Sequence, residues 1–217
     1  MKRWFLVLFF LLAIVISGQA QMERDSWMLD GQVGFSMNRQ DNKTLDAGIG
    51  TYSNSYRSKE FSLSPGLGYF VQDHWAIGLS PSFGLGWGKE ENSGNSPVNF
   101  NSFEYGLGVF SRKYFPAGDK LSFFGDFRIG GFWGDLARIE EGSSDRTVLS
   151  ESSGLEAGAS LGLQYLVSDL LGIHFQSSVI DYRRSTESGV AFGGTSTTTS
   201  WNTQLFSSFQ IGATLFF

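Results

Sequence analysis

The sequence predicts an all-β protein, an eight-stranded antiparallel up-and-down transmembrane β-barrel, and three observations support this prediction. Apolar residues alternate with small or polar ones over most of the chain, as in strands with two different faces. The 217 residues include 28 glycines and 21 phenylalanines but only 4 prolines, a composition that favours strands. After residue 20, no segment approaches the roughly 20 consecutive apolar residues of a membrane helix. Any membrane crossing therefore requires strands.

The first 20 residues are predicted to be a cleaved signal peptide. Lys2 and Arg3 precede an apolar run over residues 4–16, and the small residues Gly18 and Ala20 suit a signal-peptidase site. The alternative, a retained membrane anchor, needs a longer apolar run. We therefore expect a signal peptide over 1–20 and one barrel domain over 21–217.

Eight segments show the alternation, in regions bounded by turn-forming residues. The seventh is irregular, because Ser177 interrupts its apolar face and Ile180 lies on the opposite face, so a β-bulge is expected there. The predicted strands are Trp27 to Asn38, Lys59 to Val71, Trp75 to Trp87, Val98 to Tyr114, Lys120 to Gly134, Gly154 to Tyr165, Leu170 to Tyr182 and Trp201 to Phe217.

The connections between these segments alternate between short and long. Outer-membrane barrels have this layout, with short periplasmic turns and longer external loops. For the segment from Thr195 to Ser200, a mobile loop and an extension of two strands above the membrane both fit the composition. The short connections are 72–74, 115–119 and 166–169, and the long ones are 39–58, 88–97, 135–153 and 183–200.

The composition of the two faces predicts which one points inward. The polar face consists largely of glycine and serine, which suit a narrow lumen, whereas the apolar face carries more bulk than eight strands can enclose. A soluble sandwich or lipocalin-like barrel would also alternate, but a sandwich has no reason to collect tryptophan at strand ends. The aromatic residues predicted to form two membrane-interface girdles are Trp27, Tyr69, Trp75, Trp87, Trp133, Tyr165 and Trp201.

The last strand adds independent support for an outer-membrane barrel. Its apolar residues recur at every second position to the end of the sequence, as in C-terminal assembly signals of such barrels. We expect this strand to engage the barrel-assembly machinery. The residues of this predicted signal are Phe209, Ile211, Ala213, Leu215 and Phe217.

Two local patterns resemble those of the small outer-membrane β-barrel families grouped with the OmpA transmembrane domain, OmpX and OmpW. They are Ser64 to Val71, leading into Asp73 and residues 76–78, and Val109 to Pro116. The resemblance covers residues 21–217 and implies the barrel fold and a bacterial outer-membrane location. It implies no shared catalytic residues, and the roles of its members range from membrane-tethering scaffolds to adhesion proteins and narrow channels.

Alternation also predicts a group of charged residues inside the barrel. Glu104, Arg128 and Glu156 fall at similar heights on successive strands, so we expect Arg128 to lie between the two carboxylates and to block the lumen. Gating or proton conduction through the group is a weaker alternative. The predicted lumen charge cluster is Glu104, Asp126, Arg128 and Glu156, with Glu60 and His174 also inward. The phenylalanines expected to fill the lumen are Phe70, Phe110, Phe124, Phe132 and Phe206.

The remaining composition narrows the range of functions. The chain has no cysteine and two isolated histidines, so we expect no metal site, no cofactor and no catalytic residues. Without Lys2 and Arg3, 14 basic residues stand against 21 acidic ones, a net charge of −7 that makes nucleic acid an unsuitable partner.

The sequence therefore favours a non-enzymatic outer-membrane scaffold or surface-interaction protein. We expect it to be a monomer in contact with outer-membrane lipids, with four extracellular loops that contact an external ligand. The first alternative is a narrow channel for small or hydrophobic solutes, and the second is a lipid-modifying outer-membrane enzyme.

Overall fold

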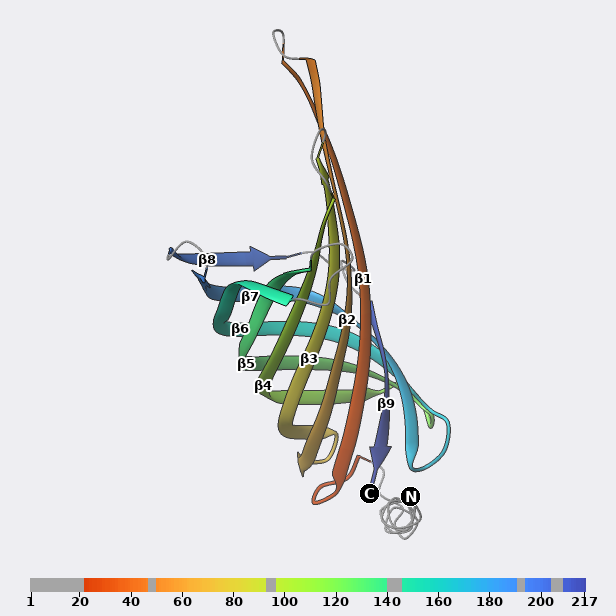
Figure 1. Cartoon of the computed structure of the whole chain (residues 1–217). Helices are drawn as coiled ribbons and strands as arrows, with labels where there is room; N and C mark the ends of the chain where they lie inside the picture. The colour runs from red at the N-terminus through yellow and green to blue at the C-terminus, as the bar shows by residue number, and fades with distance from the viewer. Residues whose placement is uncertain (1–21, 47–49, 93–96, 140–145, 191–193, 204–208) are drawn as a thin grey trace, which may run out of the picture.

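The computed structural model describes residues 22–46, 50–92, 97–139, 146–190, 194–203 and 209–217, and side chains except those of 42–54, 92 and 202. Within these residues there is no helix long and apolar enough to cross a membrane. The strands, labelled in Figure 1, are β1 (Trp27–Asp46), β2 (Gly50–Gln72), β3 (Trp75–Asn92), β4 (Val98–Pro116), β5 (Leu121–Ile139), β6 (Arg146–Leu166), β7 (Leu171–Gly189), β8 (Thr195–Asn202) and β9 (Phe209–Phe216).

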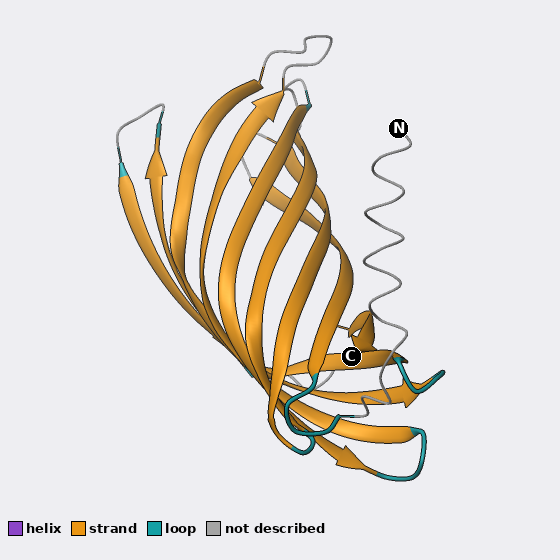
Figure 2. Ribbon diagram, turned by 90° about the horizontal axis from the view of Figure 1, so that it is seen from below, coloured by secondary structure: helices purple, strands orange, loops and turns teal. Residues whose placement is uncertain are grey.

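The strands form one closed antiparallel ring. Neighbours in sequence pair from β1 to β7, and β9 closes the ring between β7 and β1. Along β7, residues 171–177 pair with β9 and residues 181–188 pair with β8. The two segments therefore share the eighth position of the ring, where the sequence predicts one strand from Trp201 to Phe217. Figure 2 shows the strongly curved strands of this ring. The predicted eight-stranded up-and-down barrel is confirmed.

The strands at the long-connection end are longer than predicted. The pairing of β1 with β2 continues from Trp27 opposite Tyr69 to Asp46 opposite Gly50, so most of the predicted first long loop is a two-stranded extension. In Figure 1, β1 and β2 rise well beyond the rest of the barrel. The predicted alternative of a strand extension over Thr195 to Ser200 is confirmed, since β8 pairs with β7 there. The predicted signal peptide and Phe206 lie outside the described residues.

The expected irregularity of the seventh strand is a β-bulge at Val179. Ser160 pairs with Ser178 and Ala159 pairs with Ile180, which leaves Val179 without a partner on β6. The extra residue reverses which side chains face inward beyond it. Ile180 therefore points outward, with 43% of its surface exposed, although alternation from the start of the strand placed it inside. The bulge also turns Asp181 and Arg183 toward the lumen, where they line a cavity.

The two faces of the barrel have the predicted composition. Leu, Ile, Val and Phe side chains are exposed on the outer face of β1–β7 and β9, and glycine, serine and charged residues line much of the interior. The residues predicted for the aromatic girdles lie on the outer face, where they range from half-buried to exposed. Trp27 packs edge to face against Tyr69 near the short-turn end, with 5.1 Å between ring centroids. Their placement at two membrane interfaces stays a prediction.

Candidate functional site

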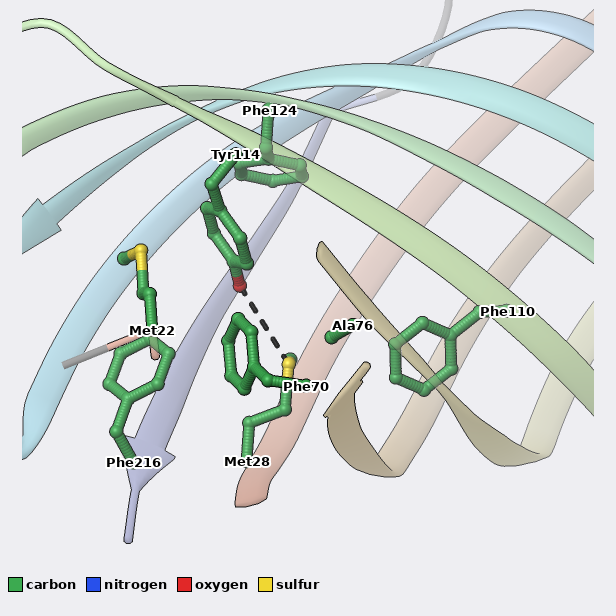
Figure 3. Packing of buried hydrophobic residues seen from close by; sticks show 8 residues of the cluster. All are labelled: Met22, Met28, Phe70, Ala76, Phe110, Tyr114, Phe124 and Phe216. Atoms are coloured by element: carbon green, nitrogen blue, oxygen red, sulfur yellow. Dashed lines mark hydrogen bonds between the residues drawn. The ribbon is translucent and has the colours of Figure 1, made fainter. Parts of the chain in front are cut away.

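The lumen is filled with aromatic side chains at its short-turn end (Figure 3). Phe70, Tyr114, Phe124 and Phe216 are almost fully buried, and Met28 packs among them. The rings of Phe70, Tyr114 and Phe216 contact one another, with 6.1–6.4 Å between the centroids of each pair. Four of the five phenylalanines predicted to point inward are buried, namely Phe70, Phe110, Phe124 and Phe132. The short-turn end of the barrel is therefore packed with side chains.

A buried ion cluster lies directly above these aromatic residues. Arg112 is fully buried and donates to both oxygens of Asp30, at 3.1 and 3.2 Å, and from Nε to Asp126 at 2.8 Å. Its guanidinium also lies 4.6 Å from the centre of the Phe124 ring. Three strands, β1, β4 and β5, meet through this one side chain. Since a buried charge without partners is costly, the bidentate geometry and two carboxylates are what allow the arginine to remain here.

Uncharged polar groups complete the partners of the Arg112 cluster. The Thr214 hydroxyl donates to Asp30 at 2.7 Å and lies 3.3 Å from Nδ1 of His174, which is fully buried. Gln32 donates to Asp30 at 2.8 Å, and Gln176 donates to Gln32 at 3.0 Å. These contacts extend the cluster across the lumen to β7 and β9, so side chains from opposite walls close the barrel at this level.

Above the cluster the lumen widens into a cavity of about 350 Å³. Asp126 and Arg128 lie at its base, and Arg128 is 3.8 Å from Asp126 and donates to Gln32 at 3.4 Å. The lining is hydroxylic and acidic. It includes Ser62, Ser64, Ser80, Ser82, Ser160 and Ser178, with the acids Glu60, Glu104, Glu156 and Asp181. A second cavity of about 360 Å³ lies beside it and shares Glu60, Glu104 and Arg183 with it.

The predicted lumen charge cluster is present, but its central arginine was predicted wrongly. Glu104, Asp126, Arg128 and Glu156 all line the first cavity. The side chain between Glu104 and Glu156, however, is Arg183, which bonds to both carboxylates and stacks over the ring of Phe132. Arg128 instead reaches down to Asp126. The error has one physical cause, because the bulge at Val179 brings Arg183 inside.

The Arg112 cluster was not predicted, although part of the signal is in the sequence. Arg112 and Asp126 are directly opposed on β4 and β5, and both follow the inward parity of their strands. Counting back from the turn between these strands would have paired them. The contact of Arg112 with Asp30 joins residues 82 positions apart on strands that are not neighbours in the ring, and no local pattern indicates it.

The interior is closed at the level of Arg112 and leaves two polar cavities above it. Among the described residues, no group of three histidine, cysteine or carboxylate side chains is arranged to hold a metal ion. His174, an inward residue that the sequence offered, is packed against Phe124 and is not exposed to the cavity. The polar side chains of the lumen form ion pairs and hydrogen bonds with one another.

A closed antiparallel ring with an apolar exterior and a polar, filled interior has the architecture of a small outer-membrane β-barrel. No known family model and no curated protein matches the chain. Several solved structures are similar to it, among them OprG from Pseudomonas aeruginosa, with 12% identity over 92% of this chain and 98% of that one and a TM-score of 0.49. Neisserial surface protein A has 13% identity, 88% and 96% coverage and a TM-score of 0.39. Ail of Yersinia pestis has 16% identity over 90% of this chain and 100% of that one, with a TM-score of 0.34. These similarities are in the path of the backbone.

Proposed function

We propose that this protein is a non-conducting outer-membrane barrel that acts at the cell surface through the strands it extends outside. One observation carries the proposal. The short-turn end of the lumen, which we propose faces the periplasm, is closed by the buried Arg112, Asp30 and Asp126 cluster together with the aromatic residues below it. A solute that enters the cavity from outside would have to break buried charge pairs to continue, which is costly.

The extended strands supply the surface for such a role. Above Gly34, the edge of β1 that faces away from β2 pairs with none of the described strands, since β9 ends its pairing there. Among the described strands, β8 pairs with β7 alone. An unpaired strand edge offers a row of backbone donors and acceptors to another extended chain. These edges, rather than irregular loops, are the surface that we propose contacts an external partner.

The two alternatives receive less support from the interior. A narrow channel would require an open path past Arg112, and a lipid-modifying enzyme would require a base that reaches the outer face. His174 is fully buried in the lumen and does not reach that face.

Single-channel recording in planar bilayers tests the closed lumen. Wild type and Arg128→Ala are both expected to be silent, because Arg128 lies above the closure and removing it leaves Arg112 paired. Steady currents through the wild-type protein would contradict the proposal, and currents through Arg128→Ala alone would move the closure from Arg112 to Arg128.

Shortening the β1–β2 extension tests the surface role. Replacing residues 40–56 with an Asn-Gly turn joins the paired residues Arg39 and Arg57, so the barrel is expected to fold and to keep its heat-dependent gel mobility. Both forms, in nanodiscs, are applied to an array of glycans and matrix proteins. Binding by the full chain that the shortened chain lacks is expected, and equal binding by both would contradict the proposal.

We also propose that the last strand acts as the assembly signal and that the barrel works as a monomer. The residues Phe209 and Ile211 are exposed on the outer face of β9, where assembly factors in the membrane can reach them. Phe209→Ser with Ile211→Ser is expected to lower the amount of folded barrel in the outer membrane, measured by heat-dependent gel mobility.

A further inference from the structure

A group of basic residues lies on the outer face of β1, β2 and β3, immediately above the apolar surface. Arg39, Arg57 and Lys89 are direct neighbours across the three strands, and all three are exposed. One row lower, Lys59 lies between Met37 and Trp87. We call Arg39, Arg57, Lys59 and Lys89 the basic row. Four cations therefore occupy one continuous patch of the barrel wall.

The height of the basic row places it among lipid headgroups. On β3, the outer face is apolar or aromatic from Trp75 to Trp87. These residues span about 40 Å of strand at about 3.3 Å per residue. With a strand tilt of about 45°, this length covers about 28 Å, close to the apolar band of about 25 Å in such barrels. Lys89 is the next outward residue, so its ammonium lies just past the hydrocarbon.

Lys59 gives a second reason to expect an anionic partner in the membrane. Its neighbours Met37 and Trp87 are 68% and 47% exposed, as expected of side chains that contact lipid. A lysine between two such residues must direct its ammonium to the headgroup level. Among the described side chains, no carboxylate lies within ion-pair distance of Lys59 or of Arg57. Arg57 is attracted to Asp41 and Glu91 only at longer range, so neither cation on β2 forms a direct ion pair with a described side chain.

The flanking cations are partly compensated by carboxylates one row higher. Arg39 bonds to Asp41 at 2.8 Å, and Lys89 lies 2.7 Å from Glu91. A hydrogen bond from the Ser55 hydroxyl lowers the pKa of Asp41, and one from Lys89 lowers the pKa of Glu91. Both carboxylates, which lie above the membrane, therefore stay ionised. Of the four cations of the basic row, the two on β2 are therefore the ones that form no direct ion pair among the described side chains.

A groove in the outer wall continues from the basic row toward β5. It has a volume of about 280 Å³ and is lined below by Leu85 and Phe103 and beside them by Trp87. Its upper end is polar, with Asn101 and the ion pair of Arg146 with Asp135. A groove that is apolar toward the membrane centre and polar toward the surface matches the upper part of a lipid, with its acyl chain below and its headgroup above.

We propose that the basic row and this groove bind a diphosphorylated glycolipid of the outer leaflet. Three adjacent strands separate Arg39 from Lys89 by about 10 Å at about 4.8 Å per strand, enough for cations to contact two phosphate groups of one headgroup. The amides of Asn99 and Asn101, in the same two rows on β4, are suited to hydrogen bonds with sugar hydroxyls. This inference rests on the position of the barrel in the membrane and not on the proposed surface role.

The test titrates the detergent-solubilised full chain with diphosphoryl lipid A, monophosphoryl lipid A or cardiolipin and measures bound lipid by native mass spectrometry. Wild type is expected to bind the diphosphoryl form most tightly. Arg57→Ser with Lys59→Ser is expected to weaken that binding about tenfold or more, since each cation near the headgroups contributes to the attraction.

The matched control removes two positive charges from the other end of the barrel. Arg24→Ser with Lys120→Ser is expected to bind within about twofold of wild type, because neither residue is near the external leaflet. Heat-dependent gel mobility checks that both variants fold. Binding unchanged in the β2 variant, or equal wild-type binding of the two lipid A forms, would overturn the proposal. Cardiolipin binding as tight as that of diphosphoryl lipid A would overturn the assignment to a glycolipid.

Discussion

Two arginines in this barrel each bind two carboxylates, but they differ in their exposure to water. Arg112 joins Asp30 and Asp126 at the closed end, and its side chain is 0% exposed. Arg183 joins Glu104 and Glu156 in the cavity, and its side chain is 38% exposed. Water can solvate the second group whenever its ion pairs open, whereas the first has only protein groups to contact.

This comparison shows that burial, more than the charge pattern, decides what an ion cluster does in the lumen. A buried charge that loses its partner keeps its full desolvation cost, but an exposed one regains water. We therefore expect Arg112 to hold the barrel closed and stable, and Arg183 to shape the electrostatics of the cavity with little effect on stability.

The largest expected effect is that of Arg112→Ala. The substitution leaves Asp30 and Asp126 buried without their cation, and it should lower the free energy of unfolding by about 3–5 kcal/mol. The measurement is urea unfolding in lipid vesicles, followed by tryptophan fluorescence. An unchanged unfolding midpoint would show that the cluster is not what stabilises the closed end.

Two glycines on β3, Gly78 and Gly84, also show the difference in packing between the closed end and the cavity. A Cβ at Gly78 would lie 2.7 Å from Cα of Gly68 and 2.6 Å from the Phe110 ring, whereas at Gly84 its nearest neighbour would be Cβ of Glu104 at 3.5 Å. Gly78→Ala should therefore cost about 1–3 kcal/mol of overpacking strain.

Gly84→Ala is the matched control, since it adds the same methyl group to the same face of the same strand. Its unfolding midpoint should stay near that of wild type in the same urea titration. If the two variants were equally destabilised, close packing would extend up into the cavity, and the contrast between the two levels would fail.

The smallest effect is expected for Arg183→Ala. Its ion pairs are more than a third exposed, so their loss should cost about 0–1 kcal/mol, and less still at about 1 M salt. Paired urea titrations at low and high salt measure this. A loss as large as that of Arg112→Ala would mean that Glu104 and Glu156 cannot regain water.

Much of the fold could be predicted because the alternation of residue types along a strand shows which side chains share a face. Alternation identified the barrel, the short turns and the inward direction of Phe70, Phe110, Phe124 and Phe132, and these predictions are confirmed. The predicted strands were too short at the long-connection end, because polar residues there continue the strands where the sequence was interpreted as loop. The polar hairpin of β1 and β2 shows this most clearly.

The candidate site depended on contacts that alternation does not contain. The sequence by itself determined the barrel, its two faces and the identity of most inward charges, because side-chain direction follows from position along a strand. Only the tertiary structure decided which charges meet. One unpaired residue, Val179, reversed the direction of Arg183, and closure of the ring brought Asp30 across the lumen to Arg112. Both depend on pairings between distant segments, which a strand read alone cannot specify.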